Sequence, residues 1–467
     1  MTKFLSQTEK NLSSRACLFV VSLVVSISSN NAIASGPAAQ QPLSQASTTD
    51  GAIPLAPFQY IPSPRWKEPD VSETANRTPA QQKVAELYKQ GNYSKAATEG
   101  MLLLTKEKVD DLLQLSIANS LAWVGRTKEA GQLYRVLQPS KYKTEALLGL
   151  ANLHRWQGRD HLALPMYKEI LTIEPENKDA IEGLRLATRE VRPRTTITLG
   201  ALHDSSNVEV RSLKLNHRWT DESMANVWEI ETGTLHSKGP TVTVSRPSLT
   251  VRFKAQESIF KPRLELGSDG KNVYGNVGIS LGDLPVLIDV GRVNWGEISN
   301  NPRALAAQLA ATRVSAQINT SLASGNLFAR AEVNNISDGN TIIASTVRFT
   351  PGWRPLGPYL KPLIGFETRD SKQSKLEYWS PAAGYGSAFA GITLERQESD
   401  WNISATIQAG TRLYGEAGSS WSASMGGKYW MNKDWALGLR LWSMASQRDL
   451  QRYRATSAFA TVEKLWD

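Results

Sequence analysis

His203, Asp204, Ser205 and Ser206 stand in a row and supply the residue types of a hydrolytic triad. A triad, however, needs these groups to converge in space, and neighbours along one strand or turn point in different directions. Asp-Ser-Ser is also a frequent turn sequence, because short polar side chains hydrogen-bond the backbone close by. We therefore interpret this segment as a turn between two strands.

Other reactive residue types are also open to a simpler interpretation. Glu229 and Glu231 share one face of a predicted strand and could form a glycosidase pair or a row of charges. His154 and His161 could bind a metal, but solvated helix positions explain them as well. The chain has no HExxH, paired-cysteine, GxSxG or phosphate-loop motif. We expect no enzyme, no metal site and no cofactor.

From about residue 194 onward, short segments alternate apolar and polar residues between clusters of Gly, Asn, Asp, Pro and Ser. In residues 401–409, WNISATIQA, the apolar side chains point to one face of a strand and the polar ones to the other. Residues 213–219, 273–281, 327–334 and 435–442 alternate in the same way. About sixteen or seventeen strand candidates fit residues 194–467, and bacterial single-chain barrels use an even number of strands.

Context favours a barrel in a membrane over a soluble sheet. The polar face carries both signs of charge, which suits a wet lumen and is costly in a dry core. Most of the 14 tryptophans lie in this region, many near strand ends, as in an interfacial girdle. The barrel insertion machinery commonly recognises an aromatic residue at the end of the last strand. Here the last strand ends on Trp466, and Asp467 follows it, so the aromatic residue is displaced by one position. We predict an antiparallel transmembrane β-barrel of ~16 strands that contacts outer-membrane lipid.

Alternation also predicts which side chains line the lumen. Sugars stack on aromatic rings and hydrogen-bond to guanidinium, amide and carboxylate groups. The residues expected to contact a polysaccharide on this basis are Tyr274, Phe328, Arg330, Glu332, Arg412, Tyr414, Arg440 and Trp442. For each aromatic residue, packing or a place in the girdle is the competing interpretation.

Residues 80–191 repeat three landmarks at spacings of 34 and then 33, the period of a tetratricopeptide repeat (TPR). The landmarks are the glycines Gly91, Gly125 and Gly158, the alanines Ala96, Ala130 and Ala163, and the series Gly100, Tyr134 and Tyr167. A glycine tolerates the turn between two helices, and a small alanine lets the paired helices approach closely. We predict a short α-solenoid, whose last helix, over residues 179–191, covers its open end.

The N-terminal region has the order of a secretory signal. Basic residues precede an apolar run over 16–28, and Ala32-Ile33-Ala34 fits a cleavage site, so residues 1–34 are expected to be removed together with Cys17. Residues 35–78 form a Pro/Gln/Ser-rich linker. The net charge of +9 is modest over this length and favours anionic lipid or an anionic polymer, with no basic helix of the type that binds nucleic acid.

A signal, helical repeats and a C-terminal barrel follow one another as in outer-membrane exopolysaccharide exporters. Residues 80–467 resemble the C-terminal part of the cellulose synthase outer-membrane subunit and also the poly-N-acetylglucosamine porin. Tyr378, Trp379, Ser380 and Pro381 resemble the aromatic-aromatic-Ser-Pro stretch before a late strand of these barrels. The repeat array here is much shorter than in typical members.

The resemblance implies a Gram-negative outer-membrane porin for exopolysaccharide export, as in cellulose biosynthesis and biofilm formation. It places the TPR domain in the periplasm, where the repeats would dock periplasmic or inner-membrane polysaccharide synthesis proteins. Two alternatives remain open on the residues alone. One is a barrel enzyme that acts on lipid or polysaccharide, and the other is a structural or receptor barrel with a plugged lumen.

Overall fold

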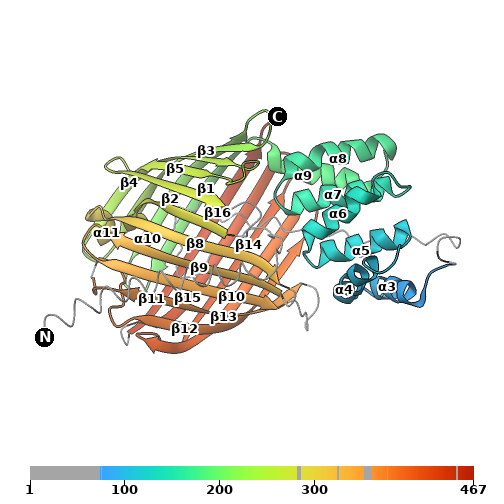
Figure 1. The fold of residues 1–467 in the computed structure, drawn as a ribbon. Coiled ribbons are helices and arrows are strands. Elements are labelled where there is room, and N and C mark those ends of the chain that lie inside the picture. The colour runs from blue at the N-terminus through green and yellow to red at the C-terminus, as the bar shows by residue number, and fades with distance from the viewer. Residues whose placement is uncertain are drawn as a thin grey trace.

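The computed structural model describes residues 74, 76–280, 286–322, 325–351, 359–375, 377–448 and 451–467. The expected signal peptide at 1–34 lies outside the described residues, as does most of the expected linker at 35–78. Described helices come first and pack beside one end of a barrel of strands (Figure 1). The predicted fold class, a short TPR solenoid followed by an antiparallel barrel, is therefore confirmed.

Before the barrel, the described helices form three antiparallel pairs and a last covering helix. Their bounds are α3 Pro79–Lys89, α4 Tyr93–Leu104, α5 Asp111–Trp123, α6 Thr127–Leu137, α7 Lys143–Trp156, α8 Asp160–Ile173 and α9 Lys178–Val191. The Thr78, Asp110 and Asn177 side chains accept backbone hydrogen bonds at the N-termini of α3, α5 and α9. Gly91, Gly125 and Gly158 have φ of +75°, +83° and +69° in the turn inside each pair. Glycine adopts this left-handed conformation without the penalty that a Cβ brings.

The other two landmark series form the packed interior of the array. Ala96, Ala130 and Ala163 are fully buried. Tyr134 and Tyr167 are buried too, and each hydroxyl donates a 2.7 Å hydrogen bond to an asparagine of the preceding helix, Asn119 and Asn152 respectively. Each ring also covers a glycine of the following helix, Gly149 or Gly183. Gly100, the first member of this series, has no ring, and the Ile117 side chain fills the space beside it.

Among the described residues, sixteen strands close into one barrel in which each strand pairs antiparallel with its sequence neighbours and β1 pairs with β16. Their bounds are β1 Arg194–Asp204, β2 Glu209–Thr220, β3 Asn226–Lys238, β4 Thr243–Ala255, β5 Arg263–Ser268, β6 Val273–Ser280, β7 Val286–Asn294, β8 Ala310–Leu322, β9 Gly325–Ile336, β10 Thr341–Pro351, β11 Leu360–Ser371, β12 Tyr385–Gln397, β13 Trp401–Gly415, β14 Ser420–Trp430, β15 Trp435–Arg448 and β16 Gln451–Leu465. Each described strand therefore has a hydrogen-bonded neighbour on both sides, which is how a barrel avoids the open edges of a flat sheet.

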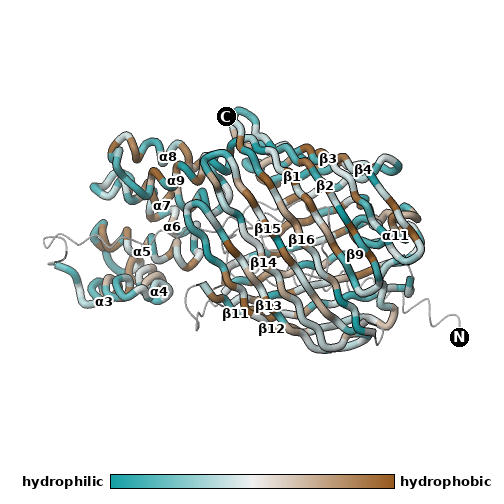
Figure 2. Tube along the Cα trace, turned by 180° about the vertical axis from the view of Figure 1, so that it is seen from behind, coloured by the Kyte–Doolittle hydropathy of each residue, from teal (hydrophilic) through white to brown (hydrophobic). Residues whose placement is uncertain are grey.

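The two faces of the barrel differ in polarity. Outward-facing Leu199, Leu266 and Ile407 are 57%, 64% and 62% exposed, whereas inward-facing Lys214 and Glu231 are buried. Figure 2 shows the same contrast as apolar and polar positions that succeed one another along β13–β16 and β1–β2. An apolar exterior around a polar interior is the distribution of a barrel in lipid and the reverse of a soluble one. None of the described helices is long and apolar enough to span a bilayer.

The helical array is attached to one end of the barrel, here called the helical end. Arg185 and Arg189 of α9 bind the Asp400 carboxylate in the β12–β13 turn at 2.8 and 3.1 Å, and Arg189 also lies over the Trp430 ring at 4.6 Å. Nε2 of His161 in α8 lies 2.7 Å from Oε1 of Glu257 in the β4–β5 turn. These contacts join two helices to two turns and to strand β14, so the array is held by more than its covalent link to β1.

The packing of Tyr134 on Gly149 predicts a difference between two glycine substitutions. A Cβ on Gly149 would lie 2.4 Å from Tyr134 Cζ, whereas a Cβ on Gly131 would meet Leu153 Cδ1 at 3.8 Å. Overpacking costs about 1–3 kcal/mol, which exceeds the ~1 kcal/mol that alanine adds to helix propensity. We expect Gly149→Ala to lower, and Gly131→Ala to keep or raise, the melting temperature of the helices in the full chain, followed by far-ultraviolet circular dichroism. Equal shifts for the two variants would contradict this packing.

Candidate functional site

A pair of short helices enters the barrel at the end opposite the helical array, here called the far end (Figure 1). They are α10 Trp295–Ser299 and α11 Pro302–Ala306, which connect β7 to β8. Asn294 and Asn301 cap their N-termini by accepting hydrogen bonds from the backbone N–H groups of Glu297 and Arg303. Local sequence thus favours both helices, because asparagine is a strong N-cap and Pro302 fits the first helical turn.

The two helices bridge opposite walls of the lumen. Leu305 of α11 packs with inward side chains of β2, β3 and β4, which are Val210, Leu235 and Val244. Trp295 of α10 packs with Ile336 and Ile342 on β9 and β10. Because these strands lie on different sides of the barrel, the pair α10–α11 narrows the far end from within. This segment was not anticipated from the strand pattern, although the Asn-Pro capping signal at 301–302 was present in the sequence.

A buried ion-pair network fixes α10 to the wall. Lys214 Nζ lies 3.2 Å from Glu231 Oε1 and 3.4 Å from Glu297 Oε1, and all three side chains are at most 10% exposed. Arg252 contacts Glu231 at 3.6 Å and Glu229 at 2.6 Å. The pair Glu229 and Glu231 is thus part of a charge network, as the charge-row interpretation describes.

The Tyr378-Trp379-Ser380-Pro381 stretch holds the β11–β12 segment against the same helix. The Tyr378 ring meets Trp295 edge-on at 5.7 Å, and its hydroxyl donates to Asp338 at 2.9 Å. Ser380 Oγ accepts the Lys375 N–H at 2.7 Å, and the Pro381 carbonyl accepts the Gly384 N–H at 2.9 Å. The motif therefore builds the far end of the lumen together with α10. The ring of Trp379 lies beside Tyr385 at 5.2 Å.

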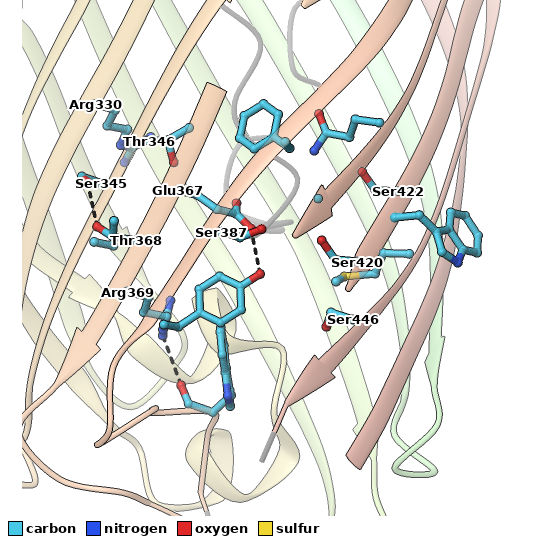
Figure 3. A pocket seen from close by; sticks show the side chains of 18 of the residues that line it. Arg330, Ser345, Thr346, Glu367, Thr368, Arg369, Ser387, Ser420, Ser422 and Ser446 are labelled. Carbon is cyan, nitrogen blue, oxygen red and sulfur yellow. Dashed lines mark hydrogen bonds between the residues drawn. The ribbon is translucent and has the colours of Figure 1, made fainter. Parts of the chain in front are cut away.

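The wall formed by β9–β15 bears a cleft, which we call the lumen cleft (Figure 3). Aromatic, hydroxyl, amide and charged side chains meet in it. The lining residues used below are Arg330, Glu332, Glu367, Arg369, Trp379, Tyr385, Ser387, Phe389, Gln408, Ser422 and Ser446. In Figure 3, Arg330, Glu367 and Arg369 lie across from Ser420, Ser422 and Ser446. Rings beside hydroxyls and planar charged groups can bind a sugar by stacking and by hydrogen bonds.

The strand register decides where the predicted lumen residues lie. Phe328, Arg330 and Glu332 share the inner face of β9, where Arg330 binds Glu332 at 2.9 Å and the Arg348 guanidinium lies 5.5 Å from the Phe328 ring. Tyr274 on β6 donates to Asp269 at 3.0 Å near the far end. Three further predicted residues lie on the inner face. Arg412 pairs with Ser387, Arg440 pairs with Phe459, and Trp442 pairs with Ser457. The lumen cleft brings together Arg330 and Glu332, whereas Tyr274 and Trp442 belong to other parts of the wall.

The prediction that Tyr414 lines the lumen is wrong, because its side chain faces outward. A β-bulge shifts the β12–β13 register between Gly386 and Ser387, so that Arg412 opposes Ser387 but Tyr414 opposes Gly386. The Tyr414 ring covers Gly386, and its hydroxyl donates to the exposed Asp370 at 3.0 Å. A single extra residue in one strand reverses the face of every position beyond it, and simple alternation cannot detect that.

His203 and its neighbours do not converge. Asp204 Oδ1 accepts the backbone N–H groups of Ser206 and Val208, which closes a turn between β1 and β2. Ser205 Oγ accepts the N–H of Arg454 at 3.0 Å. His203 is exposed on the outer face while Asp204 is buried on the inner face, as the turn interpretation describes. Among the described residues no group of three His, Cys, Asp or Glu side chains could hold a metal ion.

Comparisons with known proteins give similarities of fold. No family model matches the chain, and no curated protein matches it. A bacterial polysaccharide outer membrane secretin matches with a TM-score of 0.47 and 12% identity over 59% of this chain and 99% of that chain. OccK11 (OpdR) of Pseudomonas aeruginosa matches with a TM-score of 0.34 and 10% identity over 59% and 96%. The second TPR domain of human RPAP3 matches with a TM-score of 0.22 and 17% identity over 23% and 92%.

Because Lys214 joins α10 to the barrel wall, we predict that removing its charge loosens α10–α11 from the wall. Lys214→Met leaves the Glu231 and Glu297 carboxylates buried without their shared cation, which costs about 3–5 kcal/mol. We expect faster hydrogen exchange in residues 295–306 and a larger single-channel conductance of the reconstituted protein. Lys238→Met, at an exposed position of β3, is the matched control and should change neither. Unchanged exchange in the Lys214 variant would show that the apolar contacts alone hold the two helices.

Proposed function

We propose that the chain is an outer-membrane channel that exports an exopolysaccharide through the barrel lumen. The observation that carries the proposal is the lumen cleft, where Trp379, Tyr385 and Phe389 lie among serine, glutamine, arginine and glutamate side chains inside a closed barrel. A hydrated polymer needs a polar wall with many exchangeable hydrogen bonds, and ring faces let it stack without strong binding at any one point. Cellulose-like and poly-N-acetylglucosamine-like polymers are the candidates that the resemblance names.

The outer face supports placement in a membrane. Large apolar side chains such as Leu213, Leu215 and Ile230 are 40–48% exposed there, and water would oppose such a surface on a soluble protein. A Gram-negative outer membrane provides the lipid that this face requires, because bacterial barrels of this strand number lie in that membrane.

The helical array is proposed to lie in the periplasm. It contacts the helical end through α8 and α9, so α3 and α4 are the elements farthest along the chain from the barrel. Solenoids of this kind are usually binding surfaces. We assign the array to docking periplasmic or inner-membrane proteins of polysaccharide synthesis.

A plugged structural or receptor barrel is the second candidate. The observation that favours it is the pair α10–α11, which together with Tyr378 contacts both walls of the lumen at the far end. A channel that opens when these helices move would reconcile both descriptions. No reaction is proposed, because Glu229 and Glu231 are ion-paired and His203 is separated from Asp204.

Two neighbouring positions on β13 allow a matched test of export through the lumen. Gln408 lines the lumen cleft, and Ala409 is exposed on the outer face. In cells that make the polymer, removing the chain should trap polysaccharide in the periplasm, and the full-length chain should restore export. Gln408→Trp narrows the passage and is expected to reduce exported polysaccharide several-fold, whereas Ala409→Trp adds a ring to the lipid face and should export normally. Both amounts are measured as extracellular and periplasmic sugar.

Two results would count against the proposal. One is normal secretion by cells that lack the chain. The other is recovery of the purified chain as a soluble, monodisperse protein without detergent, which is incompatible with an outer face that contacts lipid.

A further inference from the structure

We propose that the lumen cleft recognises an acidic sugar, so that the exported polysaccharide carries carboxylate groups along its length. This inference rests on the proposed export function and names the substrate class. It differs from both polymers that the resemblance suggests, because neither of those carries a carboxylate on each sugar. The supporting observations are an unpaired guanidinium, an excess of cations and a strip of unsatisfied hydroxyls.

Arg412 is the first observation. The register places it on the inner face of β13, opposite Ser387, so its side chain begins ~5 Å from a residue of the cleft. Gly410, two residues earlier and therefore on the same face, lines the cleft as well. Arg412 is exposed, and among the described residues it has no ion pair or hydrogen bond. A guanidinium with five donors is thus available at the rim of the cleft.

The charges of the cleft are the second observation. Its two carboxylates already have partners, since Glu332 binds Arg330 at 2.9 Å and Asn334 at 3.1 Å, and Glu367 accepts the Tyr385 hydroxyl at 3.1 Å. Arg369 donates to the Trp379 carbonyl at 3.3 Å and lies 5.3 Å from the Trp379 ring. Three arginines, counting Arg412, thus face two glutamates, and a negative ligand would balance the site.

The third observation is a set of hydroxyls on β12, β14 and β15. Ser387, Ser422 and Ser446 are 1%, 6% and 4% exposed, and in the described structure their Oγ atoms have no hydrogen-bond partner. Buried hydroxyls are normally satisfied, so these three mark a position where a ligand or water supplies the partner. Sugar hydroxyls fit that requirement, because each can both donate and accept.

These features together match the parts of a uronic acid. The ring face can stack on Trp379 or Phe389, the ring hydroxyls can reach the serines, and the carboxylate can pair with Arg412 in the planar geometry that arginine favours. A neutral sugar leaves the cationic excess uncompensated, and a sugar with a free amine is repelled by it. Charge therefore decides between polymers of similar shape.

The test measures binding to the detergent-solubilised full chain by calorimetry, which does not require the channel to be open. The probes are a linear oligogalacturonate, a cello-oligosaccharide and a chitosan oligosaccharide of equal length. We expect the oligogalacturonate to bind at least roughly 10-fold more tightly than the other two, as one charge-assisted hydrogen bond supplies. Its affinity should fall as salt is raised.

Variants separate Arg412 from the general positive charge of the protein. Arg412→Ala should weaken oligogalacturonate binding roughly 10-fold, and Arg412→Lys should recover part of that loss. Arg211→Ala is the matched control, because Arg211 carries the same charge but is exposed on the outer face. Resistance to unfolding in sodium dodecyl sulfate verifies that each variant retains its barrel.

Equal affinity for the three probes, tighter binding of the cello-oligosaccharide or chitosan probe, or an unchanged affinity in Arg412→Ala would overturn the acidic-sugar assignment. The proposed export function fails separately, through normal secretion in cells that lack the chain. A chain that exports polymer but binds all three probes alike would retain the function and lose this substrate class.

Discussion

Closure of the β-sheet is the constraint on which the rest of the molecule depends. Strand β1 pairs with β16 from Arg194↔Leu465 to Asp204↔Ala455, so the first and last strands satisfy each other over their whole common length. In lipid an unpaired edge would leave backbone N–H and C=O groups without partners, each at a cost of several kcal/mol. Once the sheet is closed, alternation assigns every side chain to lipid or to lumen.

This assignment gives the barrel a polar lumen, and side chains together with α10–α11 fill part of it. Several inward-pointing charged residues form ion pairs, and Lys214 joins the wall to α10 through Glu231 and Glu297. The apolar side chains Trp295 and Leu305 of α10 and α11 enter the same space, where they pack on apolar side chains of the barrel wall. On the β9–β15 wall, the lumen cleft combines rings, hydroxyls and guanidinium groups.

The helical array obeys a different constraint, the close approach of paired helices. Buried alanines and the contact of Tyr134 and Tyr167 with glycines of the next helix set the spacing of the pairs. The array is then coupled to the barrel by Arg189, which binds Asp400 and lies over Trp430. The repeats and the closed barrel therefore meet at a junction made of ion pairs and a cation–π contact.

The sequence by itself determined the features that depend on local period. A repeat of 34 and 33 residues marked the helix pairs, and alternation in β9 placed Phe328, Arg330 and Glu332 on the inner face. Tertiary structure alone decided where that alternation breaks. The β-bulge beside Ser387 turns Tyr414 outward, because one additional residue inverts the faces that follow it.

Tertiary structure also decided the shape of the lumen. The capping signals of Asn294 and Asn301 indicate short helices, but only the closed barrel brings Val210 and Ile342 to opposite sides of them. The same holds for the lumen cleft, whose residues come from strands β9 to β15 and share no local pattern. Side-chain period is a property of neighbouring residues, whereas a binding site needs residues that are distant in the chain to meet, and that depends on strand register and closure.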